Sequence, residues 1–383
     1  MIHFAFVWRL EQEKWFDRIL RAYEIFCSRY PMLQDLLHIS VFWEGTLFNW
    51  KNISNIESTI SLPWLYYYGK IDRNLIDSIF KEHVHYSLVP SVFLETFWLV
   101  ALESLQNGVP VIGYKKGGLI PFIDHENALD ENLWAEWIVV KLYQIIQNNR
   151  LPNKNEIIHS YEQYSIDIWR RNLISLIGNS KRILIINDYK SLIGWAEVYV
   201  SFLQKNLEMN DCIVDVLGYN SPSIPSWKRK LLFLQAICNV KSFFAIREYI
   251  LNNSPEIIWC HSILRYHGVF WLLAIQLYWK NTQKMITYHD FWLISPFPSR
   301  IESIDQVPVM RGMKSWIEAS HKFLSPKLLF GLLVKYVYTF IPLILIRRFD
   351  LHIVPSQFMI WIIARNIKKE ERDITLFPHC AIR

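Results

Sequence analysis

Apolar and polar positions alternate along the first part of the chain in two periods. Short β-branched and aromatic runs bounded by turn residues predict strands, and longer segments with apolar residues three or four apart predict helices. The predicted strands are His3–Val7, Leu37–Phe42, Leu65–Tyr68, Val84–Val89 and Val109–Tyr114, and predicted helices include Phe16–Arg29 and Arg73–Glu82. This alternation is typical of βαβ units and a parallel sheet.

The second part of the chain repeats the pattern. Its predicted strands are Ile183–Asn187, Ile213–Leu217, Ile257–His261, Lys284–Tyr288 and Leu351–Pro355, and the first is followed by a predicted helix at Ala196–Leu207. We therefore predict an α/β protein with two Rossmann-like doubly wound parallel-sheet domains, residues 1–150 and 181–383, joined by a polar helical connector at 151–180. A chain of 383 residues has the length of about two domains.

Charge and cysteine usage narrow the class of partner. The 41 Lys and Arg against 35 Asp and Glu give a net charge of +6, too small and dispersed for a nucleic-acid surface. The cysteines follow no metal-ligand or disulfide spacing, so we expect neither a metal nor a disulfide framework. They are Cys27, Cys212, Cys238, Cys260 and Cys380.

The location of the protein is predicted from its apolar segments. The chain opens on a predicted strand without a signal peptide, so we expect a cytoplasmic protein. The longest apolar run, Leu328–Ile346, contains Lys335 and Pro342, which favours a buried or surface-lying helix over a membrane span. Peripheral contact of this run with the inner face of the membrane is a hypothesis; oligomeric state is not predicted.

Tryptophan is unusually frequent. The chain has 17 Trp and 12 Gly, whereas average glycine usage would give roughly 27 Gly. Five of the tryptophans follow predicted strands, where glycine often permits φ > 0 or a close backbone approach; they are Trp8, Trp15, Trp43, Trp98 and Trp195. One hypothesis is that UGA codons for glycine were translated as Trp, and UGG codons at these positions would contradict it. The other interpretation is a Trp-rich protein with large aromatic cores.

The segment Val89–Gly118, VPSVFLETFWLVALESLQNGVPVIGYKKGG, carries the strongest candidate site. A predicted strand ends there and a helix begins near Phe97, so the backbone N–H groups of Thr96, Phe97, Trp98 and Leu99 can face a diphosphate at a helix N-terminus. Glu103, about two turns into the helix, suits a ribose diol, and Glu95 lies on the sugar side of the loop. By spacing alone, Glu95 and Glu103 are more typical of a solvated helix face.

This segment resembles the E-x7-E region of retaining GT-B glycosyltransferases, in particular glycosyltransferase family 4, with Trp98 at a glycine position. Gly108-Val109-Pro110-Val111-Ile112 resembles the G-x-P-V-I element of the family, and Lys115–Gly118 its GG element. The segment Phe6–Lys14, FVWRLEQEK, is similar to the family's G-R-L-x-x-x-K-G opening. The resemblance implies that Arg9 and Lys14 bind the donor diphosphate, where two cations can neutralise a departing anion.

The second part of the chain resembles the N-terminal domain of the same family. Ile183–Val200, ILIINDYKSLIGWAEVYV, is similar to its first strand and glycine-rich loop, with Gly194 and Trp195 at the two glycine positions near donor sugar and acceptor. His289, at the end of a predicted strand, is our candidate for a polar group acting at the reacting sugar. His261 is a weaker candidate, since a lone histidine is more often structural.

The resemblance covers nearly the whole chain, but the domain order is inverted. It implies a metal-independent retaining hexosyltransferase that uses a UDP- or GDP-type sugar as co-substrate and no cofactor. A glycan or lipid-linked acceptor, in polysaccharide or glycolipid synthesis, is expected by family analogy. A circular permutant and a fragment made of halves of two transferases both explain the order.

The sequence bears on two other functional classes. A non-catalytic fragment or nucleotide-binding module remains an alternative interpretation. The feature that discriminates between it and an enzyme is whether glycine occupies positions 98 and 195. A nicotinamide dehydrogenase is disfavoured because neither half opens with G-x-G-x-x-G after its first strand.

Overall fold

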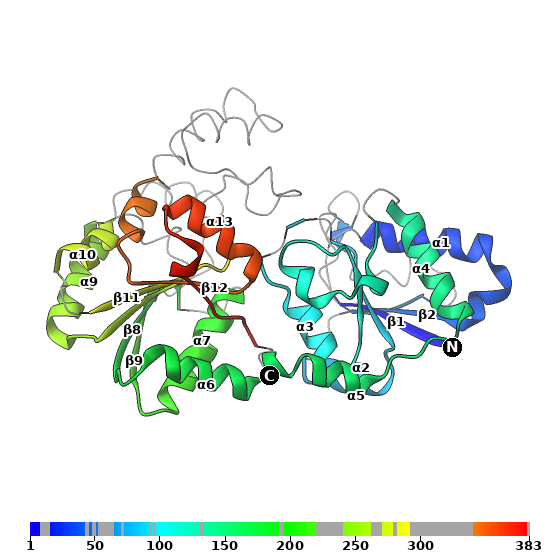
Figure 1. Cartoon of the computed structure of the whole chain (residues 1–383), viewed down its shortest axis with the longest axis horizontal. Helices are drawn as coiled ribbons and strands as arrows, with labels where there is room; N and C mark the ends of the chain where they lie inside the picture. Colours follow the sequence, from blue (N-terminus) through cyan, green and yellow to red (C-terminus); the bar gives the residue numbers. More distant parts are fainter. Residues whose placement is uncertain are drawn as a thin grey trace, which may run out of the picture. The chain divides into compact units, whose positions relative to one another are not determined.

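The computed structural model divides the chain into two compact units (Figure 1). Unit 1 comprises Met1–Trp169 with the C-terminal stretch from His379, and unit 2 comprises Arg170–Pro378. The structure describes residues 1–7, 16–42, 46–47, 51–52, 65–69, 73–91, 93–94, 96–130, 134–190, 195–219, 240–261, 270–278, 282–291 and 340–380.

Unit 1 is built on a five-stranded parallel sheet of order β5-β2-β1-β6-β7. Its strands are β1 (Ile2–Val7), β2 (Leu37–Phe42), β5 (Leu65–Gly69), β6 (Tyr86–Val89) and β7 (Val111–Gly113). Its helices are α1 (Phe16–Arg29), α2 (Arg73–Glu82), α3 (Leu99–Gln106), α4 (Trp134–Gln147) and α5 (Lys154–Ser160). A short antiparallel pair, β3 (Thr46–Leu47) and β4 (Lys51–Asn52), is separate from the sheet.

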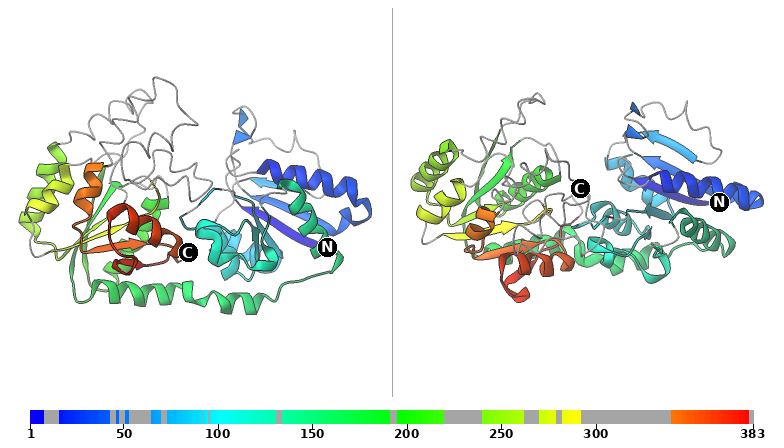
Figure 2. Two further views of the ribbon diagram at one scale, coloured as in Figure 1. Left: turned by 45° about the horizontal axis from the view of Figure 1, so that its top comes forward. Right: turned by 90° about the horizontal axis from the view of Figure 1, so that it is seen from above.

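Side chains of β1 point alternately to the two faces of this sheet, as the two-residue period of a strand requires. Phe4 and Phe6 join one hydrophobic core with α1 and α4, while Ala5 and Val7 join another with α2 and α3. Helices α1 and α4 pack against each other (Figure 2). Both faces are therefore covered, as in other parallel sheets.

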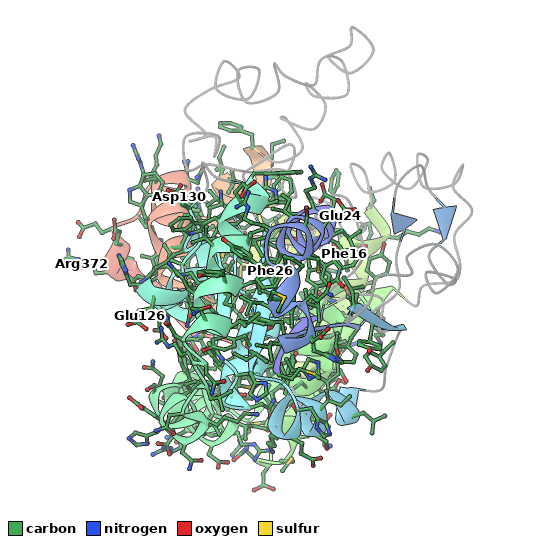
Figure 3. The ribbon with its side chains drawn as sticks, turned by 90° about the vertical axis from the view of Figure 1, so that its right-hand side faces the viewer. Phe16, Glu24, Phe26, Glu126, Asp130 and Arg372 are labelled. Carbon is green, nitrogen blue, oxygen red and sulfur yellow. The ribbon has the colours of Figure 1, made fainter. Side chains whose placement is uncertain are left out.

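Helix α1 is amphipathic, with one face buried in the core and one face exposed. Phe16 and Phe26 are buried in the core, whereas Glu24 pairs with Arg21 at 3.0 Å on the exposed side (Figure 3). The apolar residues thus face the sheet, and Arg21 and Glu24 face solvent, whereas Arg18 is buried and donates to the hydroxyl of Tyr114 at 2.8 Å.

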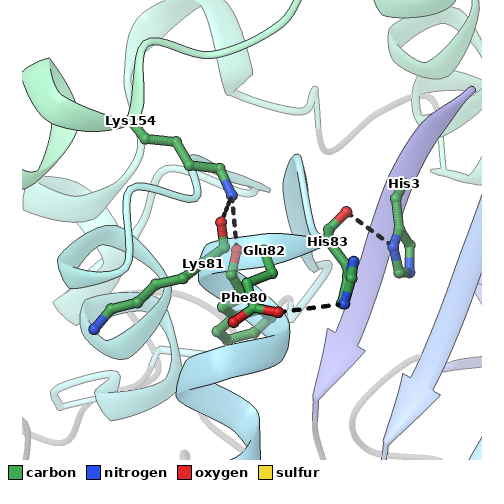
Figure 4. Close-up of polar contacts among 6 residues, drawn as sticks. All are labelled: His3, Phe80, Lys81, Glu82, His83 and Lys154. Atoms are coloured by element: carbon green, nitrogen blue, oxygen red, sulfur yellow. Dashed lines mark hydrogen bonds and ion pairs between the residues drawn. The ribbon is translucent and has the colours of Figure 1, made fainter.

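Polar contacts stabilise the amino-terminal edge of the sheet in unit 1 (Figure 4). Lys154 donates from Nζ to the backbone oxygens of Phe80 at 2.8 Å and Lys81 at 2.6 Å, which places a cation at the C-terminus of α2. His3 donates from Nδ1 to the backbone oxygen of His83 at 3.0 Å. Its Nε2 is 2.6 Å from Ser40 Oγ and therefore accepts from this hydroxyl when the ring is neutral.

Unit 2 has a six-stranded parallel sheet of order β13-β12-β11-β10-β8-β9. Its strands are β8 (Arg182–Tyr189), β9 (Ile213–Tyr219), β10 (Ile257–Cys260), β11 (Gln283–Thr287), β12 (Leu351–Val354) and β13 (Ile374–Leu376). Its helices are α7 (Trp195–Glu208), α9 (Val240–Asn253), α10 (Phe270–Tyr278) and α13 (Gln357–Ile367), and α6 (Ile166–Ile177) crosses the boundary between the units. All four residues of β10 are buried, as expected for a central strand covered on both faces.

The predicted fold class, two doubly wound parallel-sheet α/β domains, is confirmed. Helices α1 and α2 have the predicted bounds. Strand β13 was not predicted, since only three residues pair at the edge of the sheet. Helix α3 begins at Leu99 rather than near Phe97, because Trp98 has an extended backbone with φ −115° and ψ 96°. Glu103 therefore lies about one turn into α3, not two.

Candidate functional site

The strand order of unit 1 defines where a ligand can approach its sheet. From β1 the chain proceeds outward to β2 and β5, and then returns to β6 on the other side of β1. In open α/β sheets, ligands bind outside the carboxyl ends of the strands at such a reversal. The reversal in unit 1 lies between Val7, at the end of β1, and Val89, at the end of β6.

Helix α3 begins just beyond this reversal. Strand β6 is followed by Pro90 and Ser91, and Trp98 occupies the N-cap position of α3 without a side-chain cap. The first turn of a helix leaves N–H groups without intrahelical acceptors, so it carries a positive partial charge. Among the predicted residues, Thr96 and Phe97 lie in the approach to α3, and Leu99 is its first residue.

The side chain of Trp98 fills the crevice at this reversal. It is 3% exposed and lines, with residues at the ends of β1 and β6, a cavity of about 10 Å³. The lining residues are Phe6, Val7, Leu88, Val89, Pro90, Ser91 and Trp98. A cavity of this size holds one water molecule at most. A diphosphate therefore does not fit here while the indole is in place.

The backbone at Trp98 does not itself require glycine. Its φ of −115° is outside the left-handed region, so the expectation of φ > 0 is wrong at this position. Trp134, which was not among the five singled out, has φ 41° at the first residue of α4. A positive φ therefore favours glycine at position 134. At position 98, the reason for glycine is instead the space that the indole fills between the strand ends.

Glu103 occupies the fifth position of α3 and is half-buried. Its backbone oxygen accepts from Asn107 Nδ2 at 2.9 Å, and the same amide donates to Asp77 Oδ1 at 2.8 Å. Asn107 is the C-cap residue of α3, so these contacts tie the end of α3 to α2. Glu103 therefore lies on a helix whose C-terminal end is held against α2.

Several predicted site residues lie outside the described residues. They are Arg9, Lys14, Glu95 and Gly194, together with Trp8, Trp15 and Trp43. Trp195 is the first residue of α7, directly after the segment that follows β8. The proposed diphosphate ligands Arg9 and Lys14 follow β1 in the sequence.

The strand order of unit 2 reverses between β8 and β10. Polar residues with almost no solvent exposure gather at this end of the sheet: Asn187 at 0%, Asp188 at 1% and His261 at 2%. Asn187 donates to the backbone oxygen of Tyr189 at 2.9 Å and is 3.5 Å from Glu197 Oε1 on α7. Because burying polar groups costs free energy unless they form hydrogen bonds, such a cluster indicates a built site.

The rings of His261 and His289 meet edge to edge beyond the ends of the adjacent strands β10 and β11. Nδ1 of His261 is 2.9 Å from Nε2 of His289, and their ring centroids are 5.2 Å apart at an interplanar angle of 23°. Tyr199 of α7 packs edge-on against His289, with ring centroids 5.2 Å apart. The structure therefore brings together the strong and the weaker histidine candidates.

The electrostatics of this cluster favour an uncharged imidazole at His289. Burial lowers the pKa of His289 to about 4, so at neutral pH the ring carries no charge. Asp188 and Glu197 are nearby acidic groups on β8 and α7. A neutral imidazole at His289 beside an amide and acidic side chains suits hydroxyl groups better than phosphates.

Sequence reasoning did not single out Asn187, Glu197 or Tyr199. A signal for the first two was present: Asn187 ends a predicted strand, and Glu197 follows Trp195 in the segment that resembles G-G-A-E. Tyr199 had no signal of its own, because only the packing of α7 against the strand ends brings it to His289.

Two features are absent from the part of the chain that the structure describes. No group of three or more His, Cys, Asp or Glu side chains there is arranged to hold a metal ion. In the same described ranges, no helix combines the length and the hydropathy needed to cross a bilayer. Most of the apolar run Leu328–Ile346 lies outside those ranges.

The fold defines a two-unit α/β protein with a candidate ligand site at each sheet reversal. No protein-family model matches the sequence, and no curated protein matches it significantly. Among solved structures, similarity extends to the pneumococcal O-GlcNAc transferase GtfA in complex with UDP and GlcNAc, with TM-score 0.36 and 18% identity over 46% of this chain and 36% of that chain. The chain thus spans about a third of that protein.

Two further structures show the range of these similarities. The catalytic domain of cholesterol-alpha-glucosyltransferase from Helicobacter pylori has TM-score 0.34 and 18% identity over 43% of this chain and 99% of that domain. A sugar-binding protein of an ABC transporter from Bacillus halodurans has TM-score 0.22 and 8% identity over 74% of each chain. With TM-scores this low, these similarities do not carry a functional argument.

Proposed function

We propose that this protein is a retaining GT-B-type glycosyltransferase related to glycosyltransferase family 4. It transfers a hexose from a nucleotide-diphosphate sugar to a glycan or lipid-linked acceptor in cell-envelope polysaccharide or glycolipid synthesis. Unit 1 is the donor-binding side, and unit 2 is the side of the acceptor and the reacting sugar. The domain order is the reverse of that in the family.

The observation that carries this proposal is the coincidence of the motifs with the two sheet reversals. The E-x7-E segment follows β6 in unit 1, and His261 and His289 follow β10 and β11 in unit 2. The motifs are local features of the sequence, whereas the reversals depend on the order in which the strands pair. Their coincidence supports a ligand site in each unit.

In unit 1, the chemistry that we propose is stabilisation of the departing nucleoside diphosphate. The N-terminus of α3 supplies N–H groups and a partial positive charge, and Arg9 and Lys14 supply two full charges. Glu103 accepts hydrogen bonds from the ribose, and Glu95 lies on the sugar side. These groups act where negative charge develops, without a metal ion or other cofactor.

In unit 2, His289 contacts a sugar hydroxyl near the reacting centre. The bond between the anomeric carbon and the diphosphate breaks through an oxocarbenium-like state, and the acceptor oxygen bonds to the same face. The acceptor proton leaves with a phosphate oxygen of the diphosphate, so the charges balance. By resemblance to the family, Gly194 and Trp195 belong to the loop near the donor sugar and the acceptor.

Calorimetric titration with UDP and with GDP tests this proposal. Two proteins are compared: the chain as written, and a variant with Trp8, Trp15, Trp43, Trp98 and Trp195 replaced by glycine. Binding by the glycine variant alone supports the donor site and identifies the base. Absence of binding by both proteins, with their folding verified by circular dichroism, overturns the donor-site assignment.

One observation favours a second candidate, a nucleotide-binding module or fragment without turnover. Trp98 occupies the crevice of unit 1 almost completely. If the glycine variant binds UDP or GDP but releases no diphosphate in the presence of glycan and lipid-linked acceptors, this second candidate is the better description.

A further inference from the structure

The contact between His261 and His289 restricts where their hydrogen atoms lie. Nδ1 of His261 and Nε2 of His289 are 2.9 Å apart, a normal hydrogen-bond distance. Two neutral rings in such a contact share one hydrogen: one nitrogen donates it, and the other accepts through its lone pair. Since the pKa of His289 is lowered to about 4, its ring is neutral at pH 7.

This shared hydrogen couples the tautomers of the two rings. If Nδ1 of His261 carries it, Nε2 of His289 is the acceptor, and His289 has its own hydrogen on Nδ1. If Nε2 of His289 carries it, Nδ1 of His261 is the acceptor, and His261 has its hydrogen on Nε2. Both rings are therefore in the Nδ1–H form or both are in the Nε2–H form.

We propose that His261 is a positioning residue that locks the tautomer of His289 to its own, so that the two rings always share the same form. The lock is a property of the fold, and only its importance for sugar transfer rests on the proposed function. His261 acts through His289 and needs no contact with a substrate.

The surroundings of His261 suit it as the fixed member of the pair. It is 2% exposed, and its backbone N–H donates to the oxygen of Ile186 on β8 at 2.9 Å. Its ring stacks on Trp259, with centroids 5.6 Å apart at 23°. The indole of Trp259 is itself held by a 2.9 Å hydrogen bond from Nε1 to Thr287 Oγ1. Buried rings held by such a network have little rotational freedom.

The locked tautomer decides what His289 offers to a hydroxyl group. In the Nδ1–H form, the nitrogen of His289 that faces away from His261 is a hydrogen-bond donor. In the Nε2–H form, the same nitrogen is an acceptor. A lock therefore sets the polarity of recognition at this point, whereas an unlocked ring presents a mixture.

Nitrogen NMR of the full chain with ¹⁵N-labelled histidine tests the lock directly. Protonated and unprotonated ring nitrogens resonate far apart, and exchange between tautomers averages them. Signals of the pair are assigned with the variants His261→Asn and His289→Gln. At pH 7 we expect each ring in a single tautomer and both in the same form. Opposite forms, or an averaged signal for His289, would overturn the proposal.

Two substitutions of His261 separate the lock from general packing. In His261→Asn, the side-chain amide lies close to the position of Nδ1 and can still donate or accept, so His289 should keep a single tautomer. In His261→Leu the partner is lost, so the two ¹⁵N shifts of His289 should move toward each other. Retention of the wild-type shifts in folded His261→Leu would contradict the lock.

His352 provides an internal control in the same spectra. It is fully buried in unit 2, and its Nδ1 is 2.9 Å from the hydroxyl of Tyr288 rather than from either ring of the pair. Its shifts should be unchanged in both His261 variants if these have folded. This experiment requires neither a donor nor an acceptor, so failure of the proposed function leaves its result interpretable.

When a transfer assay exists, kinetics test the importance of the lock for catalysis. His261→Leu should lower kcat by roughly 10- to 100-fold, as loss of a supporting hydrogen bond does at metal-ligating histidines. KM for the donor should change less, and His261→Asn should recover most of kcat. Equal kcat values for all three proteins would remove His261 from the mechanism.

Discussion

Gly108 and Lys154 approach so closely that no side chain fits between their backbones. A Cβ atom added to Gly108 would lie 2.5 Å from Lys154 Cβ and 2.8 Å from its Cα. Gly108 also has φ 74° and follows the C-cap of α3, where its N–H donates to the oxygen of Leu105 at 2.9 Å. The glycine that opens the G-V-P-V-I element thus ends a helix and allows α5 to pack against it.

Gly108→Ala should destabilise unit 1 by about 2 to 4 kcal/mol, because a left-handed backbone and a steric clash add together. Gly178→Ala is the matched control. It has φ 59° and nothing within 4 Å of an added Cβ, so only the backbone cost of about 1 kcal/mol is expected. Urea unfolding measures both, and equal losses would contradict the steric part.

Trp98→Gly should open the crevice between β1 and β6 and make UDP or GDP binding measurable by calorimetry. It should also lower the free energy of unfolding by about 3 to 5 kcal/mol, as other truncations of buried aromatic residues do. Trp271→Gly is the control, since Trp271 is fully buried in unit 2, on α10. It should lose stability without binding nucleotide, and nucleotide binding by Trp271→Gly would disprove the role of the crevice.

Trp134→Gly should be more stable than Trp134→Ala by about 1 kcal/mol. At φ 41° the backbone favours glycine, although glycine elsewhere in a helix is less stable than alanine. Both variants remove the ring that lies 5.6 Å from the guanidinium carbon of Arg18, so their difference isolates the backbone. A more stable alanine variant in thermal unfolding would argue against glycine at this position.

The free energy of unfolding of unit 1 should fall as the pH is lowered from about 6.5. Burial, with a smaller effect of His38, lowers the pKa of His3 to about 3, and burial also lowers the pKa values of His38 and His85. A histidine with a lower pKa in the folded state than in the unfolded state binds its proton more readily when the chain is unfolded. Its contribution to the free energy of unfolding is therefore fully present above pH 6.5 and is lost as the pH falls toward 3. For His3 the loss at pH 5 is roughly 1 to 2 kcal/mol.

His3→Gln should therefore reduce the slope of stability against pH between 6.5 and 4. Glutamine keeps one donor and one acceptor for the backbone oxygen of His83 and the hydroxyl of Ser40. His159→Gln is the control, because the side chain of His159 is 85% exposed. Urea unfolding at several pH values measures the slope, and identical slopes for wild type and His3→Gln would exclude His3 as a cause.

The local pattern of the chain was sufficient for most elements of the fold. Phe16–Arg29 and Arg73–Glu82 are helices with the predicted bounds. Their apolar residues repeat at helical spacing, and these apolar faces pack against the sheet of unit 1. The edge strand β13 and the start of α3 were missed or shifted. Both depend on pairing or packing with distant residues, which spacing does not encode.

The sequence by itself determined the two α/β halves, the helix after β6 and the polar residues at strand ends, because these follow from local periodicity and short motifs. Strand order, and with it the position of each sheet reversal, was decided only by tertiary structure. The same holds for the 2.9 Å contact of His261 with His289 and the burial of Trp98 between β1 and β6. These contacts join residues far apart in the chain, and only the pairing and packing of whole elements brings such residues within a few ångströms.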